Sequence, residues 1–180
     1  MRRPNRHRVL ALAASAAISL AAAPAAQACQ NADSVPSEAT APQLVRSTLC
    51  LLNGERSKRH MKRLRLNGHL SEAATHHASD MVRREYFSHD STNGQSFVDR
   101  IKRTGYLQSA SSWYVGENLA WGANERSTPR SQLRAWMNSP GHRANILNRR
   151  FREIGLGLAL GAPEPGHRNA ATYVNDFGAR

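Results

Sequence analysis

The stretch YVGENLAWG, residues 114–122, places one carboxylate, that of Glu117, inside a run of apolar and aromatic side chains. An unpaired carboxylate is so costly to bury that it usually loses its charge or finds a partner. Residues 113–121 have the composition of a β-strand. The sequence therefore predicts a strand whose glutamate is met by polar side chains from other parts of the chain.

Helical signals dominate the sequence before this strand. Pro42 is suited to the first turn of a helix that ends in the basic run 58–65, and Asn67 is suited to cap a second helix. Ser96 begins a capping-box pattern for a short helix that should end at Gly105. The second helix has one face of helical period, made of Leu70, Ala73, Ala74, His77 and Met81. His77 is therefore predicted to be a core residue.

Helical and strand signals both follow the glutamate-containing strand. Thr128 and Pro129 are suited to the start of a helix that Pro140 and Gly141 should end. Beyond it, EIGLGLALG and ATYVNDFG are strand patterns joined by a turn, and Gly155 and Gly157 indicate close approach of another element. Early helices and late strands joined by tight turns predict an α+β domain, with an antiparallel sheet covered by helices.

The N-terminal residues 1–28 have the pattern of a signal peptide. An arginine-rich start precedes the apolar stretch 9–23, and Ala26, Gln27 and Ala28 form a small-x-small cleavage site. The apolar stretch is short for a membrane span. A lipid anchor at Cys29 is the weaker alternative, because Ala26 stands where a lipoprotein signal normally has leucine. We therefore expect a secreted, extracellular protein, with residues 43–180 forming one domain.

The two cysteines, Cys29 and Cys50, both follow the predicted cleavage site. An even number of cysteines in an exported chain predicts a disulfide, and the alternative is two unpaired thiols. A bridge would tether residues 29–42 to the first helix. In the chain-entropy model a closed loop of this length stabilises the fold by about 3 kcal/mol.

The chain is strongly basic, with a formal net charge of +12. Its densest basic run, KRHMKRLR at residues 58–65, fits either a solvated connector, which we favour, or a weak contact with an anionic surface. No nucleic-acid-binding signature is found, so nucleic acid is not expected as a partner. We expect a monomer.

Three polar residues stand out as candidates to meet in one place: His89, Glu117 and His142. Two histidines and one carboxylate can form an open zinc-type site that keeps a position for water. Each residue taken singly has a plainer interpretation, as a hydrogen-bonding histidine or a glutamate that caps a turn. His69 and His76 are further candidates. The segment NSPGH lacks the turn of a serine nucleophile, so no such nucleophile is predicted.

Residues 43–178 resemble the CAP superfamily of cysteine-rich secretory, antigen-five and pathogenesis-related proteins, and in particular its bacterial secreted, SCP-like branch. The resemblance rests on seven segments in the family's order: LCLLNGER, LSEAATHHASDM, YFSH, GENLAWG, WMNSPGHRANIL, FREIGLGLA and TYVNDFG. It implies an α-β-α sandwich, in which a central antiparallel sheet lies between helical layers. It also implies a cleft where Glu117 pairs with the imidazoles of His89 and His142, with Asn118 and Asn145 from the same motifs beside them.

Many eukaryotic relatives carry a second glutamate after the helix tryptophan, whereas residues 136–140 here contain no acid. The resemblance therefore implies a three-residue metal site of His89, Glu117 and His142 for zinc or another divalent metal. It implies a binding module for a small apolar or cell-envelope-derived ligand. The alternative is a metal-dependent extracellular hydrolase, in which Glu117 acts as ligand or general base. Because the chain shows no oxyanion hole or activated nucleophile, we favour the binding module over the enzyme.

Overall fold

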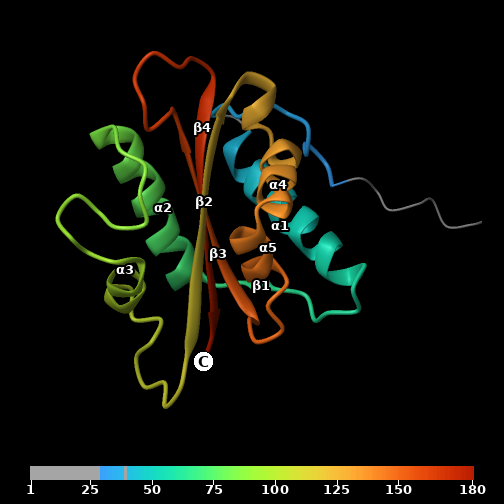
Figure 1. The fold of residues 1–180 in the computed structure, drawn as a ribbon, viewed down its shortest axis with the longest axis vertical. Helices are drawn as coiled ribbons and strands as arrows, with labels where there is room; N and C mark the ends of the chain where they lie inside the picture. Colours follow the sequence, from blue (N-terminus) through green and yellow to red (C-terminus); the bar gives the residue numbers. More distant parts are fainter. Residues whose placement is uncertain (1–28, 39) are drawn as a thin grey trace, which may run out of the picture.

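The computed structural model describes residues 29–38 and 40–180, so the predicted signal peptide lies outside the described residues. The elements are α1 (Ala41–Ser57), β1 (Arg65–Leu66), α2 (Gly68–Arg84), α3 (Phe97–Arg103), β2 (Tyr114–Ala123), η1 (Asn124–Ser127), α4 (Pro129–Asn138), α5 (Pro140–Ile146), β3 (Glu153–Leu160) and β4 (Ala170–Ala179). Figure 1 shows the sheet on edge, with α2 and α3 on one face and α1, α4 and α5 on the other. The predicted α-β-α sandwich is confirmed.

The sheet has the strand order β1-β3-β4-β2. The three long strands β3, β4 and β2 pair antiparallel, as predicted. The two-residue strand β1 adds a parallel pair with β3, which the sequence did not predict. Strand β4 is central and is buried along nearly its whole length, whereas β2 has a strand neighbour on one side only. The predicted strand around Glu117 is therefore an edge strand.

The packing of α2 on β3 depends on two glycines. A Cβ atom added to Gly155 would lie 2.0 Å from the carbonyl carbon of Leu70, and one added to Gly157 would lie 2.3 Å from that of Ala74. Such distances leave no room for any side chain, because the neighbouring atoms belong to the helix backbone. The prediction that another element approaches these glycines is confirmed, and that element is α2.

The predicted helix starts are formed by the expected caps. Asn67 accepts a hydrogen bond from the backbone of Leu70, Thr128 accepts one from Ser131, and Ser96 forms a full capping box. Gly105 follows α3 with a φ of 83°, as a left-handed residue after a helix. These ends were predictable because each cap lies within a few residues of the backbone group that it satisfies.

The segment after α4 differs from the prediction. Pro140 and Gly141 were expected to break the helix, and α4 does end before them, but Pro140 also begins the new helix α5. Ser139 before the proline is extended, with φ −97° and ψ 119°. A proline forces its preceding residue out of the helical region, yet it fits the first turn of a helix itself. The break is therefore one residue long.

The two helical layers bury different cores. Between the sheet and α1, α4 and α5 lies a large aromatic core that includes Trp136, Tyr173 and Phe177. The face under α2 is packed with smaller side chains, such as Ala74 and Val174. His77 is buried on this face, as predicted. No helix in residues 29–38 and 40–180 is long and apolar enough to span a bilayer.

The N-terminal segment is fastened at two points. Cys29 and Cys50 form the predicted disulfide, with their Cα atoms 5.8 Å apart. Asp33 also accepts a hydrogen bond of 2.7 Å from Nε of Arg130 on α4. The segment therefore links α1 to α4.

We expect Gly157→Ala to lower the free energy of unfolding by about 3 kcal/mol, because a methyl group cannot fit against the α2 backbone. Gly54→Ala is the matched control: Gly54 lies inside α1 with no atom near its missing Cβ, so alanine should stabilise the protein by up to about 1 kcal/mol. Chemical denaturation of both variants measures these changes. Equal stabilities would contradict the backbone contact between α2 and β3.

Candidate functional site

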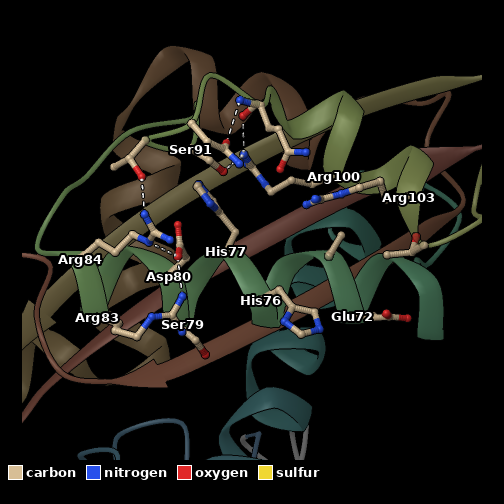
Figure 2. A pocket seen from close by; sticks show the side chains of 15 residues that line it. Glu72, His76, His77, Ser79, Asp80, Arg83, Arg84, Ser91, Arg100 and Arg103 are labelled. Carbon is tan, nitrogen blue, oxygen red and sulfur yellow. Dashed lines mark hydrogen bonds and ion pairs between the residues drawn. The ribbon is translucent and has the colours of Figure 1, made fainter.

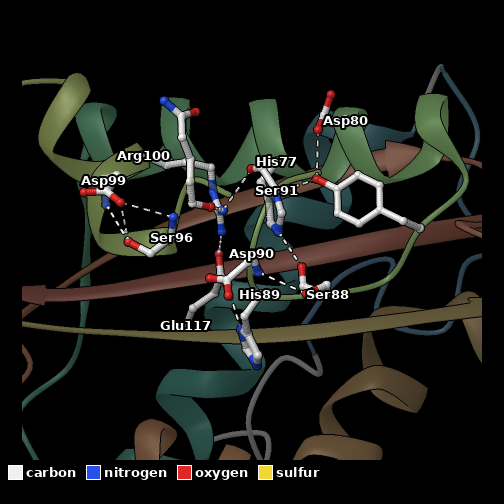
Figure 3. A network of polar contacts seen from close by, with 12 residues as sticks. His77, Asp80, Ser88, His89, Asp90, Ser91, Ser96, Asp99, Arg100 and Glu117 are labelled. Carbon is white, nitrogen blue, oxygen red and sulfur yellow. Dashed lines mark hydrogen bonds and ion pairs between the residues drawn. The ribbon is translucent and has the colours of Figure 1, made fainter. Parts of the chain in front are cut away.

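Glu117 has a fully buried side chain and two strong partners. The ring Nδ1 of His89 donates to its Oε1 at 2.8 Å, and Nη2 of Arg100 donates to its Oε2 at 2.7 Å. Figure 3 shows both contacts. The sequence predicted that two imidazoles meet Glu117. The structure places His89 in contact with it, but Arg100 occupies the second position, where His142 was expected. A guanidinium is charged at every ordinary pH, so it can neutralise a buried carboxylate where an imidazole cannot.

Three elements bring these groups together. Strand β2 turns Glu117 toward the layer of α2 and α3, and the capping box of α3 fixes the helix that carries Arg100. Glu85 ends α2 in the left-handed conformation, with φ 55°, and starts the loop that carries His89. Nε2 of His77 donates to the carbonyl of Ser88 at 2.9 Å and holds that loop beside His89. The buried His77 therefore has a structural role.

The second histidine, His142, lies on α5 in the opposite helical layer. Its backbone carbonyl accepts a hydrogen bond of 3.0 Å from the amide of Asn118. The amide of Asn145 donates to the carbonyl of Glu117 at 3.2 Å and to the side-chain oxygen of Asn118 at 2.9 Å. Both asparagines were predicted to line the cleft. Their amides hold α5 against the open edge of β2.

The two imidazoles have opposite electrostatic environments. The hydrogen bond to Glu117 raises the pKa of His89 above its ordinary value, although partial burial works against this. Burial lowers the pKa of His142, and the charge of His89 lowers it further. His142 is therefore close enough to His89 to respond to its charge. The side chain of His89 is 53 % exposed, so its environment favours the charged form of an imidazole that remains in contact with water, whereas the environment of His142 favours the neutral form.

The sequence prediction missed two residues of this site, Arg100 and Asp176. Asp176 lies directly opposite Glu117 in the strand register and is fully buried. Burial raises its pKa well above the usual range, and the neighbouring Glu117 raises it further. Neither oxygen of Asp176 accepts a hydrogen bond from a described residue, so no hydrogen bond stabilises its ionised form. An acid inside a closing strand was a visible signal; Arg100, on a short polar helix, gave none.

The structure does not offer the three metal ligands, His89, Glu117 and His142, that the sequence predicted. Within residues 29–38 and 40–180, no three histidine, cysteine or acidic side chains lie close enough to hold a metal ion. Both oxygens of Glu117 are engaged, so Glu117 is not a free ligand. The remaining donors are Nε2 of His89 and the ring of His142. A carboxylate behind a metal-binding histidine fixes the orientation of its ring, and Glu117 holds that position toward His89.

A groove of about 440 Å³ lies between α2 and α3. Figure 2 shows its polar lining. Arg83 and Arg84 pair there with Asp80, at 2.6 and 3.0 Å, and Arg103 carries a further cation. Arg100 forms part of the wall, where its Nη1 donates to Oγ of Ser91 and to the carbonyl of Gln95 at 3.2 Å each. One guanidinium therefore joins this groove to Glu117.

A second hollow, of about 410 Å³, lies between α4 and α5. Its lining is more apolar and includes Met137, Ala144 and Leu147. It shares no lining residue with the contacts of Glu117 described above.

The sequence profile of the Cysteine-rich secretory protein family (CAP) matches residues 49–174. The Bacillus subtilis protein YkwD is 40% identical over 107 residues, which are 59% of this chain and 39% of YkwD. The Bacillus subtilis membrane protein YlbC is 33% identical over 110 residues, 61% of this chain and 30% of YlbC. The chain thus spans less than two fifths of the length of these relatives.

Solved structures show the same architecture. An extracellular protein of Bacillus anthracis that contains an SCP domain superposes with a TM-score of 0.57 at 28% identity, covering 77% of this chain and 40% of that one. An outer surface protein of Borrelia burgdorferi gives a TM-score of 0.59 at 22% identity, covering 73% of this chain and 89% of that one. The second likeness concerns the fold alone.

We expect His89 to titrate above, and His142 below, the ordinary histidine pKa of 6.5. Glu117→Gln keeps the shape of the side chain but removes its charge, so it should lower the pKa of His89. The imidazole proton signals, followed by NMR across pH and assigned with His89→Gln and His142→Gln, measure both values. Glu125→Gln, an exposed acid on η1, is the control and should leave His89 unchanged.

The raised pKa of His89 determines how this residue makes folding stability depend on pH. The charged form of His89 is favoured in the folded chain, so its contribution is complete below the ordinary pKa of 6.5 and is lost as pH rises through the folded value. Glu117→Gln should remove this dependence. An unchanged His89 titration in Glu117→Gln would show that another group sets its charge.

We expect Arg100→Met to lower the free energy of unfolding by about 3–5 kcal/mol, because it leaves the buried Glu117 without its guanidinium and with only the half-exposed imidazole of His89. Arg103→Met lies one turn away on the same helix, where the side chain is exposed, and should change stability by less than about 0.5 kcal/mol. Denaturant unfolding compares the two. Similar losses of stability in both variants would show that the ion pair between Arg100 and Glu117 contributes no more than an exposed arginine does.

Proposed function

The chain belongs to the cysteine-rich secretory protein (CAP) family, and from that premise we propose that it is a secreted, extracellular binding module. Its binding site is the edge of β2, where His89 and His142 are presented, together with the groove between α2 and α3. Such a module needs a rigid site, and the buried ion pair of Glu117 with Arg100 supplies one. The proposal covers the domain alone, because the relatives that it matches are much longer proteins.

One observation carries the proposal: Arg100 serves the site and the groove at the same time. Its Nη2 holds Glu117, which orients His89, while its Nη1 holds the loop that forms the groove wall. A ligand in the groove would thus contact the same framework that orients the imidazole. The groove is lined by hydroxyl, amide and guanidinium groups and by the carboxylates of Glu72 and Asp80. Its four arginines outnumber these two acids, and this suits a polar molecule with an acidic group. A fragment of a cell envelope has this chemistry, so we favour it over an apolar ligand.

The proposal includes a divalent metal, but with two protein ligands in place of the three expected from the sequence. His89 and His142 would hold it through one ring nitrogen each, and Glu117 would keep the first ring in place. Two protein ligands leave several positions for water or for groups of a bound molecule. When bound, the metal would supply a Lewis acid that polarises an oxygen of the ligand.

The alternative hydrolase requires Glu117 as a metal ligand or as a general base. Both of its oxygens are occupied by Arg100 and His89, and no further observation favours this reading. Recovery of envelope fragments that co-purify with the protein, identified by mass spectrometry, would support the binding module. Cleavage of a peptide or ester that depends on His89 and His142 would favour the hydrolase.

We expect zinc, titrated calorimetrically at neutral pH, to bind one site that needs both imidazoles. His89→Ala and His142→Ala should each lose at least about tenfold in affinity, and Glu117→Gln should lose roughly 10–100-fold as the residue that orients the ring. Acidification should weaken binding, because a protonated imidazole cannot be a ligand. The raised pKa of His89 means that this loss begins at a higher pH than for an ordinary histidine.

His69→Ala is the matched control, because His69 is an exposed histidine on α2 that makes none of these contacts and does not line the groove. It should bind zinc as the unmodified protein does. Equal, pH-independent affinity in all the variants would remove the metal from the proposal, and it would leave the groove as the remaining candidate.

A further inference from the structure

Two connectors lie side by side at one end of the molecule, and together we call them the basic end. Residues 58–66 lead from α1 to α2, and residues 147–152 lead from α5 to β3. The backbone nitrogen of Arg65 donates to the carbonyl of Arg152 at 3.0 Å. Figure 1 shows both connectors at the end where β2 begins and β4 finishes. Segments far apart in the sequence therefore form one surface.

The basic end contains eight lysines and arginines and no aspartate or glutamate. Glu55 pairs with Lys58 and Arg59, at 2.7 and 2.8 Å. The other six are exposed and have no acidic partner among the residues that the structure describes: Lys62, Arg63, Arg65, Arg149, Arg150 and Arg152. This surface therefore concentrates uncompensated charge of one sign.

A buried arginine ties the two connectors together. Arg56 is fully buried, and its guanidinium donates to the carbonyls of Lys62, Ile146, Asn148 and Phe151 at 2.8–3.1 Å. Burial lowers the pKa of Arg56, and the charges of Arg152 and Arg149 lower it further. The exposed cations are therefore close enough to act on the interior. Like charges held together in this way destabilise the compact state, and an anionic partner would relieve that repulsion.

Large apolar side chains border the same surface. Trp113 is 40 % exposed, Tyr114 is 48 % exposed and Leu66 is 45 % exposed. The guanidinium of Arg150 lies 4.4 Å from the centre of the Tyr114 ring. Aromatic side chains beside cations are typical of protein surfaces that settle at the headgroup level of a bilayer. A partner that binds through charge alone would leave these apolar side chains exposed to water.

We propose that the basic end docks the protein onto a membrane surface rich in anionic phospholipid. The six unpaired cations would face the headgroups, while Trp113, Tyr114 and Leu66 would enter the boundary between headgroups and acyl chains. This goes beyond the binding function of the β2 edge and does not depend on it, because none of the residues involved orients His89 or lines the groove. The alternative partner is a soluble anionic polymer, which the apolar border disfavours.

The test is co-sedimentation of the purified protein with phosphatidylcholine vesicles, with and without phosphatidylglycerol. Binding should require phosphatidylglycerol and should fall as salt rises. The double variant Arg63→Gln/Arg149→Gln takes one charge from each connector without touching a described hydrogen bond of either side chain. It should lose roughly 25-fold in affinity, at about fivefold for each charge removed. Trp113→Ser should also weaken binding while leaving the salt dependence unchanged.

The matched control is Arg126→Gln/Arg168→Gln, which lowers the net charge equally on η1 and on the β3–β4 turn, at the opposite end of the molecule (Figure 1). It should bind about as well as the unmodified protein. Near-ultraviolet circular dichroism should show the same fold for every variant. Equal losses in control and test variants would reduce the effect to overall charge and overturn the proposal. Displacement by soluble polyphosphate, with Trp113→Ser binding unchanged, would identify a polymer as the partner instead.

Discussion

The ion pair between Glu117 and Arg100 is the constraint on which the site depends. A charge inside a protein has to be compensated, and Glu117 is compensated by a guanidinium from a different layer of the sandwich. This one contact fixes α3 relative to β2, orients His89 and shapes the wall of the groove. A buried pair of this kind contributes little net stability over a well-packed apolar pair, although breaking it is costly. Its contribution is therefore mainly to position these elements. The neighbouring Asp176 is also buried, and its raised pKa disfavours a second negative charge beside Glu117.

The buried charge of Arg56 is compensated without a carboxylate. Its guanidinium is surrounded by backbone carbonyls of two connectors, whose dipoles replace the missing anion. The arrangement gives irregular chain a fixed course and satisfies carbonyls that would otherwise be buried unpaired. Two interior arginines thus organise the loops at two places in the fold, one through an acid and one through the backbone. The second leaves the charge of Arg56 without an acidic partner, beneath a surface that is itself rich in cations.

The sequence predicted most of the fold because its signals are local. Caps at Asn67, Ser96 and Thr128, and the glycines of β3, each report on neighbours within a few residues or on a backbone with no room for a side chain. The site was only partly predictable. The apolar residues around Glu117 in the sequence marked it as a candidate, and the resemblance to the family indicated His89. Arg100 could not be found, since nothing in a short polar helix shows which of its cations turns inward. Strand β1 is two residues long and exists only because β3 lies beside it.

Strand β4 occupies the centre of the sheet and follows every other described element in the chain. Strands β2 and β3 do not pair with each other: among the described strands β2 pairs with β4 alone, and β3 pairs with β4 and with the two-residue β1. A chain that emerges from its N-terminus, from a ribosome or from a translocation channel, therefore holds all of β2 and most of β3 without a strand partner, and an open aromatic core, until this segment arrives. Helices such as α2 can form early, but the sheet closes in one late step of high contact order. The topology thus delays folding until the domain is complete, which is the condition that passage through a narrow channel requires.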